Sequence, residues 1–283
     1  MTSKYLSGSL FLTLLACTTS VPSALADDIF RIGIVARDAG SAHVEGLAQI
    51  ESEFGRAVSR TIQVFVAENF DRLIEAQLSG RIDYAVYSTQ AFAAAQLRCE
   101  CLRPLAAPVA SDGSLGIRSV LIGDAEAEGG NGLRLAVGAD DSLATRLIPL
   151  FASPEAKAAQ SSGKLIVAAN TGEARALYEQ RAVEGYFGWR PAWPSDAPST
   201  DAGGTGSWRS GTIPYGPHAV RNDLDRDVVA ALAAMLVHGV AGEETAATLL
   251  DPRSSGSFIA VDAEDYSLAL DAVALLRDRK TGN

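Results

Sequence analysis

Residues 30–36, FRIGIVA, form a short apolar run that ends at the polar Arg37 and Asp38. Behind this run, apolar side chains recur near helical spacing at Val44, Leu47, Ile50, Phe54 and Val58. Such a pattern predicts a buried strand, then a loop, then an amphipathic helix. The stretch therefore indicates the first strand–helix unit of an α/β protein.

The same unit recurs immediately downstream. TIQVFVA at 61–67 predicts a second strand, and NFDRLIEAQLSG at 69–80 predicts a helix closed by Gly80. RIDYAVYS at 81–88 predicts a third strand. Strands that alternate with helices in this way imply a parallel, doubly wound sheet.

After a break, the pattern resumes and predicts a second α/β lobe. SVLIGD at 119–124 and LRLAVGA at 133–139 predict strands, and a helix opens at Ser142 and is interrupted near Pro149. Helices and strands then alternate at 153–160, 164–169, 172–180 and 183–189. Residues 191–211 contain too much Pro, Gly, Ser and Asp for regular structure and predict a mobile loop.

The C-terminal part contains a further predicted strand at 218–224 and helices at 228–240 and 266–276. We expect these elements to return to the first lobe. The expected division is a signal peptide at 1–26, one lobe from 27–115 with 212–283, and a second lobe from 116–211. A linear pattern does not show which strands share a sheet, so the return is a hypothesis.

The first 26 residues differ from the rest of the chain. Lys4 is their only charge, Leu10 to Cys17 form an apolar run, and SALA ends in small residues before Asp27. This predicts a secretory signal cleaved after Ala26, although LLAC also resembles the site at which bacterial lipoproteins are acylated, here Cys17. No later stretch approaches the roughly 20 apolar residues of a transmembrane helix. We therefore expect a soluble protein exported to the periplasm.

Charge and cysteine content exclude several classes of function. With 34 acidic and 24 basic residues the net charge is −10, which does not suit binding to nucleic acid or anionic lipid. Cys99 and Cys101 in RCEC could pair, but a ring closed over two residues is tight, and a structural or incidental role is the simpler interpretation. The three histidines His43, His218 and His238 add no metal-ligand spacing. We expect no metal and no cofactor.

Enzyme motifs are absent from the sequence. It contains no G-x-S-x-G, no H-E-x-x-H and no P-loop, and neither GGNG nor GGTG extends to the dinucleotide pattern. His218 in YGPHAVR could act as a base, but a lone histidine at the end of a strand is more often structural. We therefore expect no catalytic residues and no enzymatic activity.

Five segments together resemble the phosphonate-binding proteins of bacterial ABC importers, a branch of the type II periplasmic binding proteins. They are FRIGIV (30–35), LSGRIDYAVYSTQAF (78–92), VGADDSLATRLIP (137–149), IPYGPHAVRNDL (213–224) and VDAEDYSLALDAVALL (261–276). The resemblance implies two α/β lobes joined by two crossovers, with a small anion such as phosphate, phosphite or a phosphonate held in a cleft between them. It also implies a membrane permease as partner, and we expect a monomer.

Ligands of open α/β sheets lie beyond the carboxyl ends of the strands, where helix N-termini attract anions. Hydroxyls donate hydrogen bonds to an oxyanion, and a guanidinium can bind two of its oxygens. The candidate ligand-binding residues at the predicted strand ends are Arg37, Tyr87, Ser88, Thr89, Ser142, Thr145, Trp189 and Arg190. Arg190 is the expected main charged contact, with Arg37 second.

Each candidate also has a structural interpretation. Ser88 and Thr89 could be helix caps, Arg37 could pair with Asp38, and Trp189 could serve packing. In GADDSLATRLIPL (138–150), an acidic side chain or Ser142 could simply cap the helix that follows.

The sequence departs from the family pattern at three points. Where the family carries a Ser-Thr-Ser-Gly type motif, this chain has Ser142, Leu143, Ala144 and Thr145, so two hydroxyls are missing. A histidine often found before a second-lobe helix is replaced in NTGEA (170–174). Trp189 and Arg190 fall near acidic positions that recognise amino groups. We therefore expect a plain oxyanion, or a ligand whose apolar part lies on Trp189 or Tyr87, rather than an aminophosphonate.

These observations favour a periplasmic solute-binding protein that delivers its ligand to an ABC importer. The alternative is a subunit that presents the ligand to a membrane sensor kinase, because the same closure of the lobes can report occupancy. An exported enzyme on the same fold is the third hypothesis. The genes beside this one distinguish import from sensing.

The intact mass of the exported protein tests the predicted signal. We expect a mature chain that begins at Asp27, because the small-residue site precedes an acidic pair. A chain that begins at Cys17 and carries a diacylglycerol would show that the protein is a lipoprotein instead.

Overall fold

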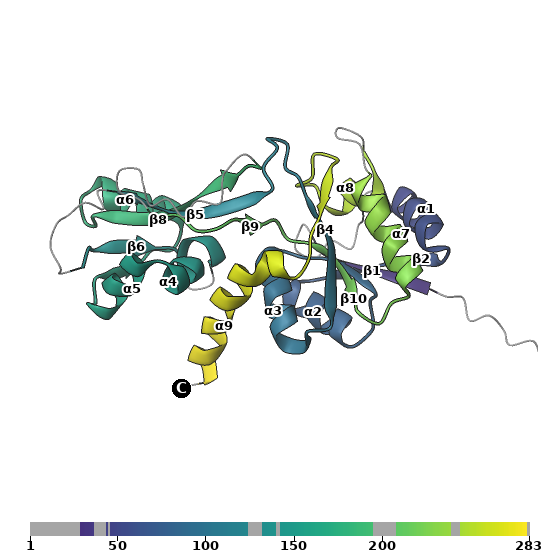
Figure 1. Cartoon of the computed structure of the whole chain (residues 1–283), viewed down its shortest axis with the longest axis horizontal. Helices are drawn as coiled ribbons and strands as arrows, with labels where there is room; N and C mark the ends of the chain where they lie inside the picture. The colour runs from purple at the N-terminus through teal and green to yellow at the C-terminus, as the bar shows by residue number, and fades with distance from the viewer. Residues whose placement is uncertain are drawn as a thin grey trace, which may run out of the picture.

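The computed structural model describes residues 29–36, 44, 46–123, 132–139, 142–194, 208–238 and 244–281, with side chains described up to 276. The predicted signal peptide, Arg37, the Asp140–Asp141 pair and most of the predicted loop at 191–211 lie outside these residues. The described residues form two α/β lobes, each built on its own sheet (Figure 1). Within this part of the chain, every helix is too short or too polar to cross a bilayer.

The first sheet has six strands in the order β11-β4-β10-β3-β1-β2. Their bounds are β1 Ile29–Val35, β2 Thr61–Ala67, β3 Tyr84–Val86, β4 Leu102–Pro108, β10 His218–Arg221 and β11 Phe258–Ala260. Its helices are α1 Leu47–Val58, α2 Phe70–Leu78, α3 Thr89–Cys99, α7 Arg226–Val237 and α8 Ala246–Leu250. The sheet therefore combines strands from both ends of the chain.

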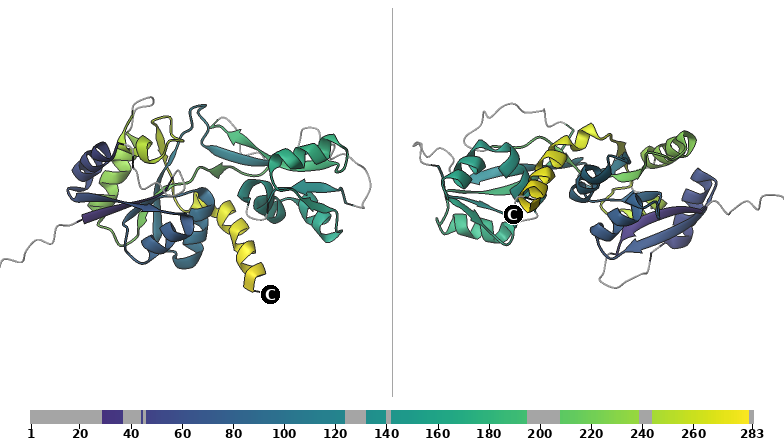
Figure 2. Two further views of the ribbon diagram at one scale, coloured as in Figure 1. Left: turned by 180° about the vertical axis from the view of Figure 1, so that it is seen from behind. Right: turned by 90° about the horizontal axis from the view of Figure 1, so that it is seen from below.

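Alternating side chains divide the core of this lobe into two layers. Phe30 and Tyr84 pack with Phe54 of α1 and Leu232 of α7 on one face. On the other face, Ala85 and Tyr87 pack among α2 and α3, with side chains such as Leu73 and Phe92. Helices thus cover both faces of the sheet, as Figure 2 also shows.

The second sheet has five strands in the order β7-β6-β8-β5-β9. Their bounds are β5 Gly116–Gly123, β6 Leu135–Val137, β7 Leu165–Val167, β8 Gly185–Ala192 and β9 Ile213–Pro214. The helical segments are the π-helical turn η1 Leu143–Leu147, α4 Ile148–Ala152, α5 Pro154–Ser161 and α6 Thr171–Glu179. The predicted interruption near Pro149 is the change from η1 to α4.

The expectation of a parallel sheet is wrong in part, because both sheets are mixed. β1 is parallel to β2 and β3, but β10 is antiparallel to both β3 and β4. In the second sheet β6 is parallel to β7 and β8, whereas β5 is antiparallel to β8. The reversed strands flank the crossovers. β5 and β10 each follow a crossover, and each is antiparallel to both of its neighbours in its sheet.

The last helix, α9 Ser267–Thr281, follows the short 3-10 turn η2 Glu264–Tyr266 and contacts both lobes. Ala272 and Val273 of α9 share one apolar cluster with Ala93 of α3 and with Leu147 and Ile148 at the η1–α4 junction. Both views in Figure 2 place α9 between the two sheets. The C-terminal helix therefore does not return to the first lobe alone, as the sequence suggested, because its small residues fit helices of both lobes.

Cys99 and Cys101 form a disulfide at the turn between α3 and β4. The intervening Glu100 caps α3 in the left-handed region, with φ 48°. The pair therefore has a structural place in the fold. Within the described residues, no group of three or more His, Cys, Asp or Glu side chains could hold a metal ion.

Candidate functional site

The first candidate group lies where β3 ends and α3 begins. The Ser88 hydroxyl caps α3 by accepting a hydrogen bond from the Ala91 amide, at 3.2 Å. The Thr89 hydroxyl donates to the Pro214 carbonyl oxygen, at 2.7 Å. Both side chains are half-buried. The cap and the positive end of the helix dipole therefore stand at the carboxyl edge of the sheet, where an anion is favoured.

Tyr87 directs its side chain into the core rather than toward this edge. Its ring is 1 % exposed, and its hydroxyl donates to Oε1 of the buried Gln77, at 2.7 Å. Burial raises the pKa of the Tyr87 hydroxyl well above its ordinary value, and the charge of Arg98 lowers it only in part. The Tyr87 side chain is therefore not available to a ligand at the sheet edge, where the residue presents its backbone carbonyl instead.

The crossover that returns from the second lobe runs directly against this edge. The Tyr87 amide donates to the Pro217 carbonyl, at 3.0 Å. A Cβ atom at Gly216 would lie 2.0 Å from the Tyr87 carbonyl oxygen and 2.6 Å from the Ser88 Cα atom. Only glycine therefore permits the crossover to lie this close to the N-terminus of α3.

In the second lobe, the helical segment that follows β6 starts with a hydroxyl pair. The Ser142 hydroxyl caps η1 and lies 2.5 Å from the Thr145 hydroxyl, which is almost fully buried. A Cβ atom at Gly138, directly after β6, would lie 2.0 Å from the Thr145 Oγ1 atom, so a side chain there would displace the hydroxyl pair. Ser142 is thus the helix cap, one of the alternatives that the sequence of residues 138–150 left open.

Trp189 and Arg190 lie within β8, not beyond the strand end where the sequence placed them, because the pairing with β5 continues to Ala192. β8 also contacts η1. Trp189 is opposite Ser119 and Arg190 is opposite Arg118. The Trp189 side chain is 53 % exposed and Arg190 is also exposed. Core packing therefore does not account for Trp189, and its ring is available on the surface of this lobe.

The structure adds one residue that the sequence analysis did not single out, Arg253. It lies in the loop between α8 and β11, and its Nη2 atom donates to the Tyr87 carbonyl, at 3.3 Å. Its Nε and Nη2 atoms also donate to the two carboxylate oxygens of Asp251, at 2.7 and 2.5 Å. The Arg253 side chain is 42 % exposed. A cation therefore stands beside the edge formed by Tyr87 and Ser88.

Behind Arg253, a chain of buried polar groups leads into the core. The Asp251 Oδ2 atom lies 3.5 Å from Nε2 of His218, and Nδ1 of His218 is hydrogen-bonded to the Tyr84 hydroxyl. His218 and Tyr84 are fully buried, and Asp251 is 1 % exposed. Burial, with the charge of Asp251, raises the pKa of Tyr84 far above its usual value.

The charge of Asp251 depends on its two basic neighbours. Burial alone would raise the pKa of this carboxyl, but the polar contacts and charges of His218 and Arg253 hold it well below the usual range. Asp251 is therefore ionised in the folded protein. Because His218 is inaccessible, its role here is structural, as the sequence interpretation favoured.

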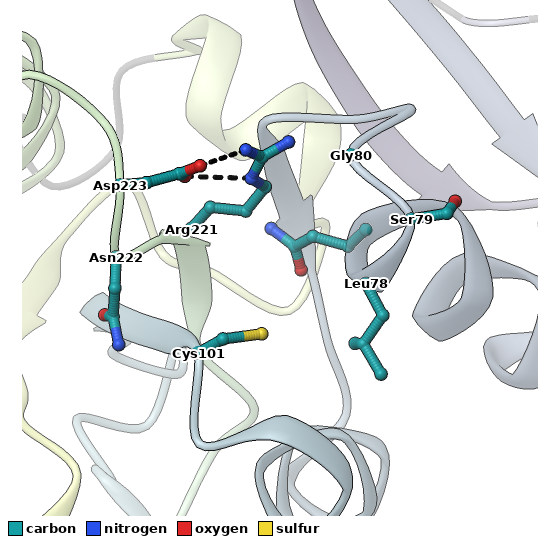
Figure 3. A pocket seen from close by; sticks show the side chains of 8 residues that line it. Leu78, Ser79, Gly80, Cys101, Arg221, Asn222 and Asp223 are labelled. Atoms are coloured by element: carbon teal, nitrogen blue, oxygen red, sulfur yellow. Dashed lines mark hydrogen bonds and ion pairs between the residues drawn. The ribbon is translucent and has the colours of Figure 1, made fainter.

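A cavity of about 380 Å³ lies at the other end of β3 (Figure 3). Its lining comprises Gln77, Leu78, Ser79, Gly80, Cys101, Arg221, Asn222 and Asp223. The Arg221 guanidinium is already paired with the Asp223 carboxylate, as the dashed lines show. The Arg221 amide bonds the Asp83 carbonyl, just before β3, so this cavity is not at the predicted anion site.

Comparison with known proteins identifies the family. The family described as "ABC transporter, phosphonate, periplasmic substrate-binding protein" matches residues 32–266. The chain belongs to this family. The phosphonate-binding family consists of periplasmic substrate-binding components, so a small ligand and a membrane permease are the partners that membership implies. The resemblance noted in the sequence is confirmed. Among curated proteins, none matches the chain.

Solved structures share the fold at low sequence identity. XAC2383 from Xanthomonas citri, solved with chloride and with ATP, is 14 % identical with a TM-score of 0.56, over 89 % of this chain and 98–99 % of that one. A binding protein component of a phosphonate ABC transporter from Pseudomonas aeruginosa is 16 % identical with a TM-score of 0.48, over 89 % and 87 %. Transferrin 1 from Manduca sexta is 10 % identical with a TM-score of 0.51, over 88 % and 46 %. The two-lobed fold expected from the sequence is confirmed.

The Asp251→Asn variant tests the buried ion pair. We expect the free energy of unfolding near pH 7 to fall by about 3 kcal/mol, the lower end of the range for a broken buried pair, because Arg253 is half-exposed. The folded-state pKa of Asp251 is depressed, so the unfolded state binds more protons in acid. Its stabilisation is thus complete above about pH 5 and is lost progressively as pH falls from the ordinary carboxyl pKa toward the depressed pKa of the folded state.

Urea unfolding at several pH values measures both effects. The stability of the variant should fall less steeply below pH 5 than that of the wild type. Asp223→Asn is the matched control, because Asp223 also pairs with an arginine two residues away but is 63 % exposed. Its effect should stay within about 1 kcal/mol. If the free energy of unfolding falls equally steeply below pH 5 in wild type and in Asp251→Asn, Asp251 is not the carboxylate that stabilises the fold in this way.

Proposed function

We propose that this protein binds a small phosphorus oxyanion in the cleft between its lobes and delivers it to the permease of an ABC importer. The proposed lobes are residues 27–115 with 212–283 and residues 116–211, except that β9 Ile213–Pro214 belongs to the second sheet and α9 contacts both lobes. Family membership over residues 32–266 carries the proposal. The polar groups at the carboxyl ends of β3 and β6 support it, because each lobe presents a capped helical segment there.

In the first lobe, the N-terminus of α3 contributes the positive end of its dipole and the Ser88 and Thr89 hydroxyls. α3 has 11 residues, enough for a substantial dipole. In the second lobe, the Ser142 and Thr145 hydroxyls share one hydrogen bond, which leaves one O–H able to donate outward. Closing the lobes would bring these donors to opposite sides of one anion. Arg37, from the first lobe, and Arg190, from the second, would supply its charge partners.

The side chains in the second lobe favour a ligand without an amino group. By the resemblance, Trp189 and Arg190 fall near positions where aminophosphonate binders carry acids, and neither has a carboxylate to pair with an ammonium. Trp189 is exposed and could cover an alkyl group. Phosphate, phosphite and simple alkylphosphonates are therefore the proposed ligands. We also propose that the protein catalyses no reaction and acts as a periplasmic monomer.

Thermal melts of ligand-stripped protein test the ligand class. A ligand that binds only the folded state adds about 2.7 kcal/mol at a hundredfold excess over Kd. For a chain of this size, methylphosphonate or phosphate should then raise the melting temperature by a few degrees, about 5 °C. Aminoethylphosphonate should gain nothing from its amine. If these oxyanions give no shift, but a cationic or neutral metabolite does, the proposed ligand class is wrong.

The Arg190→Ala variant tests the main charged contact. We expect its affinity for the same oxyanions, measured by isothermal titration calorimetry, to fall roughly ten- to a hundredfold, because a charge-assisted hydrogen bond contributes about 1.5–3 kcal/mol. Arg175→Ala is the control in the same lobe, since Arg175 is paired with Glu179 on the surface of α6. If the folded Arg190→Ala protein binds these oxyanions as tightly as wild type does, Arg190 does not contact the ligand.

A further inference from the structure

We propose that Arg253 is an oxyanion-binding residue of the first lobe, and that the buried chain Tyr84–His218–Asp251 positions its guanidinium. This inference rests on the proposed function and adds a charged contact to the same site. The position of Arg253 is the first argument. Its Nη2 atom bonds the carbonyl of Tyr87, the residue that directly precedes the cap of α3.

The hydrogen bonds of Arg253 leave part of its guanidinium available. The group has five N–H donors. The Nε–H and one Nη2–H are directed at the two oxygens of Asp251, and the second Nη2–H can serve the Tyr87 carbonyl. Among the described residues, none accepts a hydrogen bond from Nη1. The two N–H groups of Nη1 therefore remain on a side chain that is 42 % exposed, and because they diverge from one nitrogen, one of them can donate to an oxygen of a ligand.

Asp251 is held rigidly, and this fixes the direction of Arg253. Its backbone ends α8 through a bond from its amide to the Ala247 carbonyl, and its own carbonyl accepts from the Ser254 amide. His218 faces its carboxylate from the core, in edge contact with the Phe258 ring at 4.9 Å between centroids. Both carboxylate oxygens bond Arg253, whereas His218 Nε2 lies 3.5 Å from Oδ2 without a hydrogen bond. The backbone of Asp251 and the two-point contact therefore give the guanidinium one preferred plane.

The buried end of the chain is Tyr84. Its hydroxyl is hydrogen-bonded to Nδ1 of His218, and burial, with the charge of Asp251, keeps the pKa of Tyr84 high. Nε2 of His218 faces Asp251, 3.5 Å from its Oδ2 atom. Arg253 compensates the carboxylate with one edge and presents its other edge outward.

A structural role alone is the competing explanation, in which Arg253 merely neutralises Asp251. The two roles differ in what a substitution changes. A neutralising arginine affects the stability of the protein, whereas a ligand-binding arginine also affects the affinity of the folded protein. Arg253→Lys separates them, because lysine keeps a positive charge against Asp251 but has a single nitrogen and lacks the second one that arginine can turn to a ligand.

The experiment is calorimetric titration of ligand-stripped protein with methylphosphonate and with inorganic phosphate at fixed pH and salt. We expect Arg253→Ala to weaken binding roughly ten- to a hundredfold and Arg253→Lys about tenfold. Asp251→Asn should weaken it less than Arg253→Ala, because the guanidinium remains but loses its anchor. Arg221→Ala is the matched control and should bind within about twofold of wild type, since its Asp223 pair lies at the opposite end of β3.

The outcomes separate this inference from the proposed function. If wild type binds the probes and folded Arg253→Lys and Arg253→Ala bind equally well, the role of Arg253 is structural and the proposed function stands. If Arg253→Ala does not fold, the comparison of Arg253→Lys with wild type decides the matter. If wild type binds neither phosphate nor methylphosphonate, both proposals are overturned.

Discussion

The close approach of the returning crossover to the carboxyl end of β3 is the constraint on which the rest of the structure depends. Gly216 has no side chain, so the segment can lie against the Tyr87 carbonyl and the Ser88 backbone. Bonds from Thr89 to Pro214 and from Tyr87 to Pro217 fix it there. Within five residues the chain leaves β9 of one sheet and enters β10 of the other. The N-terminus of α3 is thereby placed beside the passage between the lobes.

A second link between the lobes is apolar. α9 packs its small residues against α3 and against the η1–α4 junction, in one cluster. α3 and η1 are also the segments whose N-terminal caps are the candidate anion contacts, Ser88 and Ser142. Any closing of the lobes must therefore slide or pivot helices over this cluster. Small side chains such as Ala93 and Ala272 suit such motion, because they interlock less than large ones.

The buried polar chain gives His218 a structural place in the core. Tyr84, His218 and Asp251 resemble a proton relay in order, but all three are enclosed by the core. An enzyme needs its base within reach of a substrate. Here the relay ends instead at Arg253, whose side chain reaches solvent. Because they are buried, Tyr84, His218 and Asp251 cannot reach a substrate, and in our proposal they position the guanidinium of Arg253.

The sequence by itself determined the α/β class, most elements and the family, because apolar periodicity and glycine or serine at element ends are local signals. It also identified Ser88 and Ser142 at strand ends, since a cap is specified by the few residues beside it. Only the tertiary structure decided the direction of β10, the placement of α9 against both lobes, and the burial of Tyr87. Arg253 could not be found in DPRSSGS (251–257), because its neighbour Tyr87 is 166 residues away. Contacts over such separations depend on how sheets assemble, and no local pattern records that.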